Sequence, residues 1–398
     1  MGYKPLGECV ERIIDHRGLT PKKLGGSWSE SGYRALSAKN IKNGLLVQED
    51  AMNLVSEEMY RQWMPEEVKR GDVFITSEAP FGEVLYWDSD EKLVLSQRVF
   101  GLTAKTGVCN SRYLYYWMRS PQFQGELRGR ATGTTVIGLR QPELLKCQVN
   151  LPPLEQQTAI ACLLGAIDGK ISLNNQINGY LADAVDGLFE KALGQAEEKT
   201  LTDVVEILSG GTPKTIISEY WEDGEIPFFG PGDANGSTYC LTTAKRITQL
   251  GLENCNSELY PVDTVFLTAR GTVGKVAMAG KPMAMNQSCF AFRGLGVSQP
   301  AVYQIIKRAV RSLKAKANGA TFAAINTRDL KIEKILVPSN EELTVFEEEA
   351  ASLHSMMRVN EEESLKLSSL RDALLPKLIA GEIDVSKIDL TQLNSHLA

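Results

Sequence analysis

The sequence predicts an α+β protein with two duplicated α/β domains, separated by two long helices that form a coiled coil. An internal repeat is the first reason. The stretch from Gly133 to Pro152 returns 186 residues later, from Gly319 to Pro338. The second reason is a heptad pattern of apolar residues that follows each copy. Because solenoid repeats have periods of about 20–50 residues, the duplicated unit is a whole domain together with its helix.

The repeat also sets the expected domain boundaries. Further upstream the offset between the copies becomes 192, so that Val73–Thr76 aligns with Val265–Thr268 and Gly82 aligns with Gly274. The chain of 398 residues then divides into four segments. They are a first domain at 1–150, a first spacer helix at 151–199, a second domain at 200–338, and a second spacer helix with a C-terminal tail at 339–398.

Within each copy, strand-like runs come first and a helix comes late, which favours an α+β fold over a doubly wound sheet. Short runs of β-branched and aromatic residues between turn signals predict the strands. In the first domain they are 72–76, 83–87, 93–95 and 98–102, with a helix at about 110–128. In the second domain they are 264–268, 275–278 and 288–292, with a helix at about 299–317.

The spacer segments carry the helical pattern. Leu151-Pro152-Pro153 suits a helix start, and seam residues from Ile160 to Leu188 then recur at alternating steps of four and three. The matching seam from Phe346 to Leu374 is less apolar but keeps the same register. Each helix of roughly 40 residues would extend about 60 Å, which is long enough to hold two domains at a set separation.

Asn174 and Asn360 occupy equivalent positions near the middle of the two seams. If the helices pack antiparallel, the two asparagines meet, and a buried asparagine pair fixes register at a cost in stability. The alternative is a kinked or frayed mid-helix with both side chains in water.

Composition excludes some classes of protein. No stretch of eighteen apolar residues occurs and the N-terminus lacks a signal sequence, so a cytoplasmic protein without membrane contact is expected. Seven scattered cysteines and three distant histidines predict reduced thiols and no metal site. The net charge of −6 comes from the spacer segments, whereas the two domains are mildly basic, at +2 and +3. An ordinary solvated surface explains this charge as well as phosphate binding does.

Several motifs in this order resemble the specificity subunit of type I restriction–modification systems. They are Leu151–Gln157 leading into Ile167–Ile171, Ala373–Ile383 near the end, and Thr268–Val276 with Asn286–Ser288 in the second domain. The resemblance covers nearly the whole chain. It implies two target recognition domains, each reading half of a split site in double-stranded DNA, and an antiparallel coiled coil that fixes the spacer.

The resemblance also implies the partners. Two methyltransferase subunits would dock on the helices, and restriction subunits would join in the full assembly. The subunit would have no catalytic centre and no cofactor of its own. S-adenosylmethionine would belong to the methyltransferase, and ATP and magnesium to the restriction subunit.

Polar, Gly-rich loops in both domains supply side chains for DNA contact. Arg, Lys, Asn and Gln reach base edges in the major groove, while cations and hydroxyls bind phosphates. In the first domain the candidates are Arg34, Ser37, Lys39, Asn40, Lys42, Asn43, Thr76, Ser77, Glu78, Gln97, Arg98, Arg130, Thr132, Thr134 and Thr135. In the second they are Thr212, Lys214, Thr215, Asp233, Asn235, Ser237, Arg270, Thr272, Lys275, Asn286, Gln287, Lys316, Asn318 and Thr321. Ordinary surface turns have the same composition.

The repeat separates two roles among these candidates. Residues identical in both copies cannot explain two different half-sites, so they favour framework or phosphate contact. They are Thr76/Thr268, Gln97/Gln287, Gly82/Gly274 and Thr135/Thr321. Residues that differ favour base reading. They are Glu78/Arg270, Arg98/Ser288 and the loosely aligned Lys39/Gly232.

Two other classes of protein remain open. A standalone DNA-modifying enzyme would need a nucleophile–base or metal constellation, and Gly271–Lys275 lacks the spacing and the Ser/Thr of a P-loop. A coiled-coil scaffold without DNA contact would not need duplicated domains with diverged polar loops.

Overall fold

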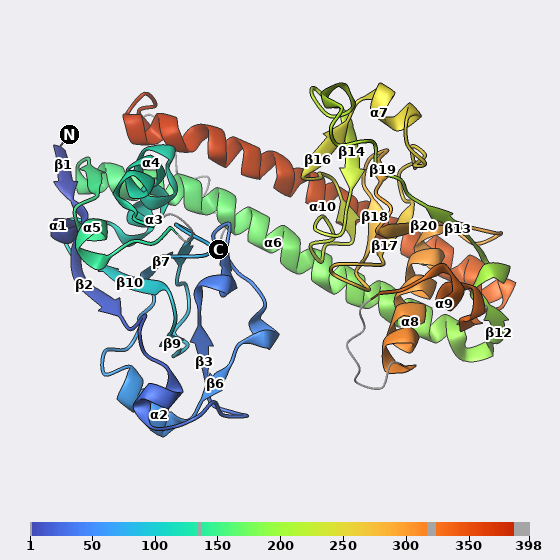
Figure 1. Cartoon of the computed structure of the whole chain (residues 1–398), viewed down its shortest axis with the longest axis horizontal. Helices are drawn as coiled ribbons and strands as arrows, with labels where there is room; N and C mark the ends of the chain where they lie inside the picture. The colour runs from blue at the N-terminus through green and yellow to red at the C-terminus, as the bar shows by residue number, and fades with distance from the viewer. Residues whose placement is uncertain (1, 134–136, 317–323, 386–398) are drawn as a thin grey trace. The chain divides into compact units, whose positions relative to one another are not determined.

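A computed structural model describes residues 2–133, 137–316 and 324–385 of the chain. The chain divides into two compact units that do not follow chain order. Unit 1 holds residues 1–170 and 367–398, and unit 2 holds residues 171–366. Each unit therefore contains one α/β domain and a segment of both long helices, and each is described by itself (Figure 1).

The domain of unit 1 is built on a four-stranded antiparallel sheet in the order β2-β10-β7-β8. A small sheet in the order β6-β3-β9 lies beside it, with β3 parallel to β9. Its strands are β1 (Gly2–Pro5), β2 (Val10–Asp15), β3 (Tyr33–Leu36), β4 (Ile41–Lys42), β5 (Leu45–Leu46), β6 (Leu54–Val55), β7 (Val73–Thr76), β8 (Val84–Tyr86), β9 (Val94–Leu95), β10 (Val99–Ala104) and β11 (Gln148–Leu151). Its helices are α1 (Leu6–Cys9), α2 (Glu57–Trp63), α3 (Ser111–Arg119), α4 (Pro121–Arg130) and α5 (Gln141–Leu145).

The domain of unit 2 repeats this plan with a five-stranded sheet in the order β13-β20-β17-β18-β15 and a small sheet in the order β16-β14-β19. Its strands are β12 (Glu197–Thr200), β13 (Val205–Ser209), β14 (Ile226–Phe229), β15 (Tyr239–Cys240), β16 (Lys245–Ile247), β17 (Val265–Thr268), β18 (Val276–Ala279), β19 (Ala284–Met285), β20 (Cys289–Gly294) and β21 (Lys334–Val337). Its helices are α7 (Gln249–Glu253), α8 (Gln299–Lys316) and α9 (Thr327–Ile332).

The predicted strands are confirmed in both domains, and α8 confirms the second predicted helix. The helix predicted at about 110–128 is instead two helices, α3 and α4. Pro121 cannot continue α3, and the Ser120 hydroxyl accepts a hydrogen bond from the Phe123 N–H at 3.2 Å, which starts a new helix.

Each domain is closed by a pair of strands from its two ends. β1 pairs antiparallel with β11 in unit 1, and β12 pairs antiparallel with β21 in unit 2. These pairs end next to the predicted boundaries at 150 and 338, so each long helix starts where its domain closes.

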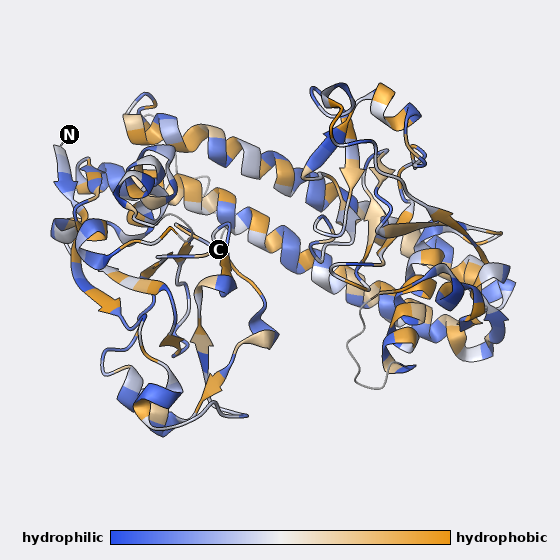
Figure 2. Ribbon diagram, in the orientation of Figure 1, coloured by the Kyte–Doolittle hydropathy of each residue, from blue (hydrophilic) through white to orange (hydrophobic). Residues whose placement is uncertain are grey.

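The long helices are α6 (Leu154–Ala192) and α10 (Asn340–Ala380), and Figure 2 shows hydrophobic residues recurring along both. Every predicted seam position on them is buried or half-buried, which confirms the heptad pattern. In unit 2 the rings of Phe189 and Phe346 pack edge to face, with centroids 5.1 Å apart. In unit 1 Arg371 donates to Asp168 at 2.7 Å. Both contacts fit an antiparallel pair.

Asn174 and Asn360 are in contact, as the seam predicts. The Asn174 amide donates to the backbone oxygen of Asn360 at 3.3 Å and to the Glu363 carboxylate at 2.8 Å. The Asn360 amide donates to the side-chain oxygen of Asn178 at 2.8 Å. Asn174 is buried, so the alternative with both side chains in water is wrong.

Candidate nucleic-acid interface

Three loops of the first domain meet at one end of its sheets. They follow β3, follow β7 and precede β10. The Ser96 N–H donates to the Leu36 oxygen at 2.8 Å, and the Ser77 N–H donates to the Arg98 oxygen at 2.8 Å. These bonds tie the loops together, and we call residues 37–43, 77–82 and 96–98 the first junction.

The second domain repeats the arrangement bond for bond. The Asn286 N–H donates to the Phe229 oxygen at 3.0 Å, and the Ala269 N–H donates to the Ser288 oxygen at 2.8 Å. Residues 230–238, 269–275 and 286–288 form the second junction. Since β3 pairs parallel with β9 as β14 does with β19, Leu36 aligns with Phe229. This register confirms the pairing of Lys39 with Gly232.

Thr76 and Thr268 hold the turns of the two junctions. The Thr76 hydroxyl accepts a hydrogen bond from the Glu83 N–H at 2.9 Å, and the Thr268 hydroxyl accepts one from the Lys275 N–H at 3.0 Å. Each hydroxyl also donates to a carbonyl within its turn. Both side chains are fully buried, so of the two roles expected for this pair, the geometry supports framework.

Three first-domain candidates are removed from the DNA-contacting set because they are buried. Thr76 holds its turn, and Ser77 is 1% exposed. The Asn40 side chain is fully buried and binds Ser37 and the Val47 oxygen, so its polar atoms are already used.

Three predicted cations are held by carboxylates. Arg34 binds Glu49 and Glu91, and its hydrogen bond to Glu91 raises its pKa further. Arg130 binds Glu126 at 2.8 Å, which likewise raises its pKa. Lys316 binds the buried Glu333 at 2.7 Å. Neutralised cations contribute little to phosphate binding, so these residues are weaker candidates than the sequence indicates.

The exposed candidates in the first domain are Lys39, Lys42, Asn43, Gln97, Arg98 and Thr132. Those in the second are Thr212, Lys214, Thr215, Asn235, Arg270, Thr272, Lys275 and Gln287. Ser37, Glu78, Ser237 and Asn286 are half-buried. Asp233 is also half-buried, and its carboxylate accepts from the backbone N–H groups of Gly230 and Ala244, each at 2.8 Å, which shapes the loop. Thr134, Thr135, Asn318 and Thr321 lie outside the described residues.

The two junctions differ in charge at equivalent positions. In the first, Arg98 pairs with Glu78 at 3.1 Å. In the second, Arg270 stands where Glu78 stands and is exposed, with no side-chain partner among the described residues. The second junction therefore presents an uncompensated guanidinium.

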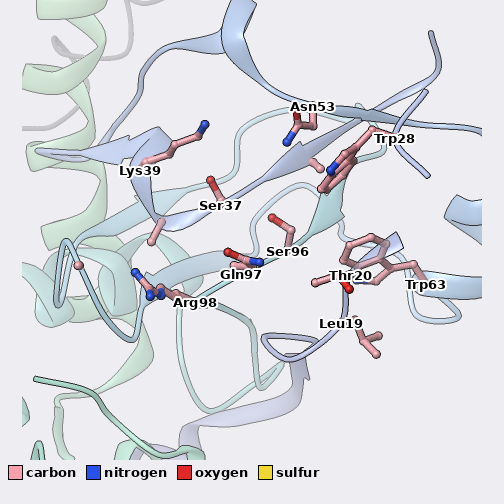
Figure 3. A pocket seen from close by; sticks show the side chains of 13 residues that line it. Leu19, Thr20, Trp28, Ser37, Lys39, Asn53, Trp63, Ser96, Gln97 and Arg98 are labelled. Carbon is pink, nitrogen blue, oxygen red and sulfur yellow. The ribbon is translucent and has the colours of Figure 1, made fainter. Parts of the chain in front are cut away.

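A cavity of about 360 Å³ opens in the first junction (Figure 3). Its lining brings together the predicted Ser37, Lys39, Gln97 and Arg98. It also includes residues that the sequence reading missed, which are Thr20, Trp28, Asn53, Trp63 and Ser96. Thr20 and Trp28 belong to the loop after β2. The corresponding loop after β13 contains the predicted Thr212–Thr215, so transferring that prediction across the repeat finds Thr20 but not Trp28.

A family model described as the type I restriction modification DNA specificity domain matches the chain twice, over residues 5–181 and 194–361. The chain belongs to the type I restriction–modification specificity family. We call its two α/β domains the first and second recognition domains. No described helix combines the length and apolar character needed to cross a bilayer.

Curated members of the specificity family are similar over much of the chain. The MjaIX specificity subunit of Methanocaldococcus jannaschii is 24% identical over 347 residues, covering 80% of this chain and 79% of the relative. The HindI specificity subunit of Haemophilus influenzae is 28% identical over 199 residues, covering 47% and 41%. A crystal structure of the S subunit from M. genitalium has a TM-score of 0.55 at 16% identity, covering 95% of each chain, which shows the same fold.

Proposed function

We propose that this chain is the DNA-reading subunit of a type I restriction–modification complex, that its two junctions read the two halves of a split site, and that it positions two adenine-methylating partners on that site. One observation carries the proposal. The junctions share a buried framework, in which Thr76 matches Thr268, but differ in their charged side chains, because the half-buried Glu78 stands where the exposed Arg270 stands. A shared framework with different charged groups suits two readers of unlike sequences.

The exposed residues divide by the contact they are suited to make. Lys42 and Lys275 carry single ammonium groups that suit phosphates. Lys39 and Arg270 differ from their equivalents in the other domain and carry donors that suit a guanine edge in the major groove. Gln97 and Gln287 are identical in the two domains, so they suit contacts that both half-sites share. The chemistry of methyl transfer belongs to the partner, which brings S-adenosylmethionine, and cleavage belongs to restriction subunits.

The test is to map methylated adenines in cells that carry this chain with its methyltransferase. The expected result is one motif with two short defined halves and a fixed undefined spacer. Replacing residues 200–338 with the second domain of another specificity subunit should change one half only. An unsplit motif, or methylation that persists unchanged without this chain, contradicts the proposal.

A further inference from the structure

The cavity of the first junction has a polar side and an aromatic side. Trp28 is 43% exposed and packs against the buried Trp63, with ring centroids 6.2 Å apart at 34°. Figure 3 shows Ser37, Gln97 and Arg98 away from these two rings. The amides of Asn53 and Gln97 have no side-chain partner among the described residues, so both are free to bind a ligand.

The shape of the cavity restricts what part of DNA can enter it. Base edges in a duplex lie at the floor of a groove about 8.5 Å deep, so groups that read them must protrude from the protein. A concave site is filled only by something that protrudes from the DNA. Two parts qualify, which are the sugar–phosphate backbone and a nucleotide rotated out of the stack.

The lining chemistry favours the nucleotide. An indole face stacks on any base, and side-chain amides match the donors and acceptors of a Watson–Crick edge. A phosphate would depend on Lys39 and Arg98, but the Glu78 carboxylate lies 3.1 Å from the Arg98 guanidinium and repels an anion there. We propose that this cavity holds one base of the first half-site, rotated out of the duplex and stacked on Trp28. This inference rests on the proposed function.

In the second recognition domain, the tryptophan equivalent to Trp28 has other contacts. Trp221 precedes β14 by the same distance as Trp28 precedes β3. Its indole N–H donates to the Lys214 oxygen at 3.2 Å, and the Lys245 ammonium lies 5.4 Å from its ring centroid. Since Trp221 already has these contacts, rotation of a base into this subunit is confined to the first half-site.

The experiment uses the chain assembled with its methyltransferase and duplexes that carry the mapped site. Each base pair of the site is replaced in turn by a mismatch, and the Kd is measured. Unpairing a base costs a few kcal/mol, so a mismatch at the rotated position removes part of that cost. The methylated adenines are left out of the comparison, because the methyltransferases rotate those bases themselves. Among the other positions, one in the first half-site should bind roughly tenfold tighter as a mismatch, and every mismatch in the second half-site should weaken binding.

Variants of Trp28 connect this effect to the cavity. Trp28→Ala should weaken binding about 5- to 150-fold and abolish the gain from the mismatch, because base stacking on an aromatic contributes about 1–3 kcal/mol. Trp28→Phe keeps an aromatic face and should restore most of the affinity, which separates stacking from misfolding.

The outcomes distinguish this inference from the proposed function. If mapped DNA binds but every mismatch in the first half-site away from the methylated adenine weakens binding, no base is rotated into the cavity and the inference fails alone. If Trp28→Ala and Trp28→Phe behave alike, the cavity does not stack a base, and again only the inference fails. If the complex does not bind the mapped DNA, both proposals fail.

Discussion

A single charge exchange distinguishes the two reading surfaces at the residue scale. Glu78 compensates Arg98 in the first junction, whereas Arg270 in the second has no side-chain partner in the part of the chain that the structure describes. A free guanidinium reaches either a guanine edge or a phosphate, and these two contacts have different consequences when they are lost.

Arg270→Ala should affect the second half-site alone. Loss of a guanine contact should cost about 1–3 kcal/mol and relax one base position, whereas loss of a phosphate contact should weaken all sequences and lower the salt slope by about one. Methylation mapping and Kd measured against salt separate the two. Arg293→Ala is the matched control, because Arg293 is 51% exposed but bound to Glu206 on the sheet. Equal changes in both half-sites would show that the domains do not read independently.

Thr268→Val should destabilise the second recognition domain and weaken its half-site. The substitution keeps the shape but leaves the Lys275 N–H without the acceptor that lies at 3.0 Å, which costs about 1–3 kcal/mol. Thermal unfolding measures the effect, and Thr344→Val on an exposed face of α10 provides the control. If the Thr268→Val protein has an unchanged Tm and an unchanged affinity for DNA, Thr268 has no framework role.

Comparison of the two copies in the sequence suggests which residues form the framework and which read bases, but it does not indicate which side chains are buried. The repeat groups Thr76 with Thr268 as shared residues, and their burial supports a framework role, whereas it leaves Asn40 and Ser77 among the exposed loop residues although both are buried. Arg34 and Lys316 bind carboxylates that are distant in the sequence, so their ion pairs could not be predicted. Arg130 binds Glu126 one helical turn away, which the sequence does not indicate because α4 extends beyond the predicted helix end at about 128. Trp28 was missed because a single aromatic in a loop has no periodic pattern.

At the scale of elements, the long helices were the most predictable part, since eighteen seam positions specify one buried face. The middle of that face is polar. The Asn174 side-chain oxygen is buried without a partner among the described residues, so this position lowers stability while fixing the register.

Replacing Asn174 and Asn360 together with Leu should raise the Tm and loosen the register. The unsatisfied oxygen is removed and apolar contact replaces it, but no polar group then marks the correct pairing. Register is measured by disulfide trapping, in which Asn178→Cys with Met357→Cys reports the native pairing and Asn178→Cys with Ala350→Cys reports a slip of one heptad. A lower Tm, or no slipped product, would contradict this expectation.

His354 on α10 couples the helix to the second recognition domain and to pH. Its Nδ1 lies 3.3 Å from the Tyr239 hydroxyl, and burial lowers its pKa from 6.5 to about 4. The folded protein therefore keeps His354 neutral, while the unfolded chain gains a proton below about pH 6.5. Stability should fall as the pH drops from about 6.5 towards 4.

His354→Gln should remove this acid-side loss, with Tm measured between about pH 4.5 and 8.

Glu361 acts in the opposite direction, because burial raises its pKa to about 7, and stability should fall as pH rises from 4.5 through 7. Glu361→Gln should therefore raise the Tm at neutral pH and not at acid pH. Each variant is the control for the other. If the two variants give the same dependence of Tm on pH, neither His354 nor Glu361 makes the stability depend on pH.

For the whole molecule, chain order predicted four successive segments, whereas contacts group the residues into two interleaved units. The repeat could reveal that each domain recurs with its helix. It could not reveal that residues 367–385 pack with the first domain, because this depends on contacts such as the Asn150 amide donating to the Ile379 oxygen at 3.1 Å.

Duplication also predicts the stoichiometry. Two equivalent helices offer two equivalent docking surfaces, so we expect the chain to be inert alone and to bind two methyltransferase subunits. Leu173 on α6 and Val359 on α10 are equivalent in the repeat, and both are apolar and exposed, at 45% and 57%. Isolated apolar residues on a surface are common, but an equivalent pair on duplicated helices favours a shared partner contact.

Native mass measurement of Leu173→Asp and Val359→Asp complexes tests the stoichiometry and the surface together. A buried aspartate at an apolar contact opposes docking, so each variant should lose one methyltransferase and retain the other. The double variant should bind neither, and Ile332→Asp, at an exposed residue on α9, should still bind two. If the chain without substitutions binds one or four methyltransferase copies, the twofold arrangement is wrong. Two copies retained in all variants would place docking on a different surface and leave the twofold stoichiometry intact.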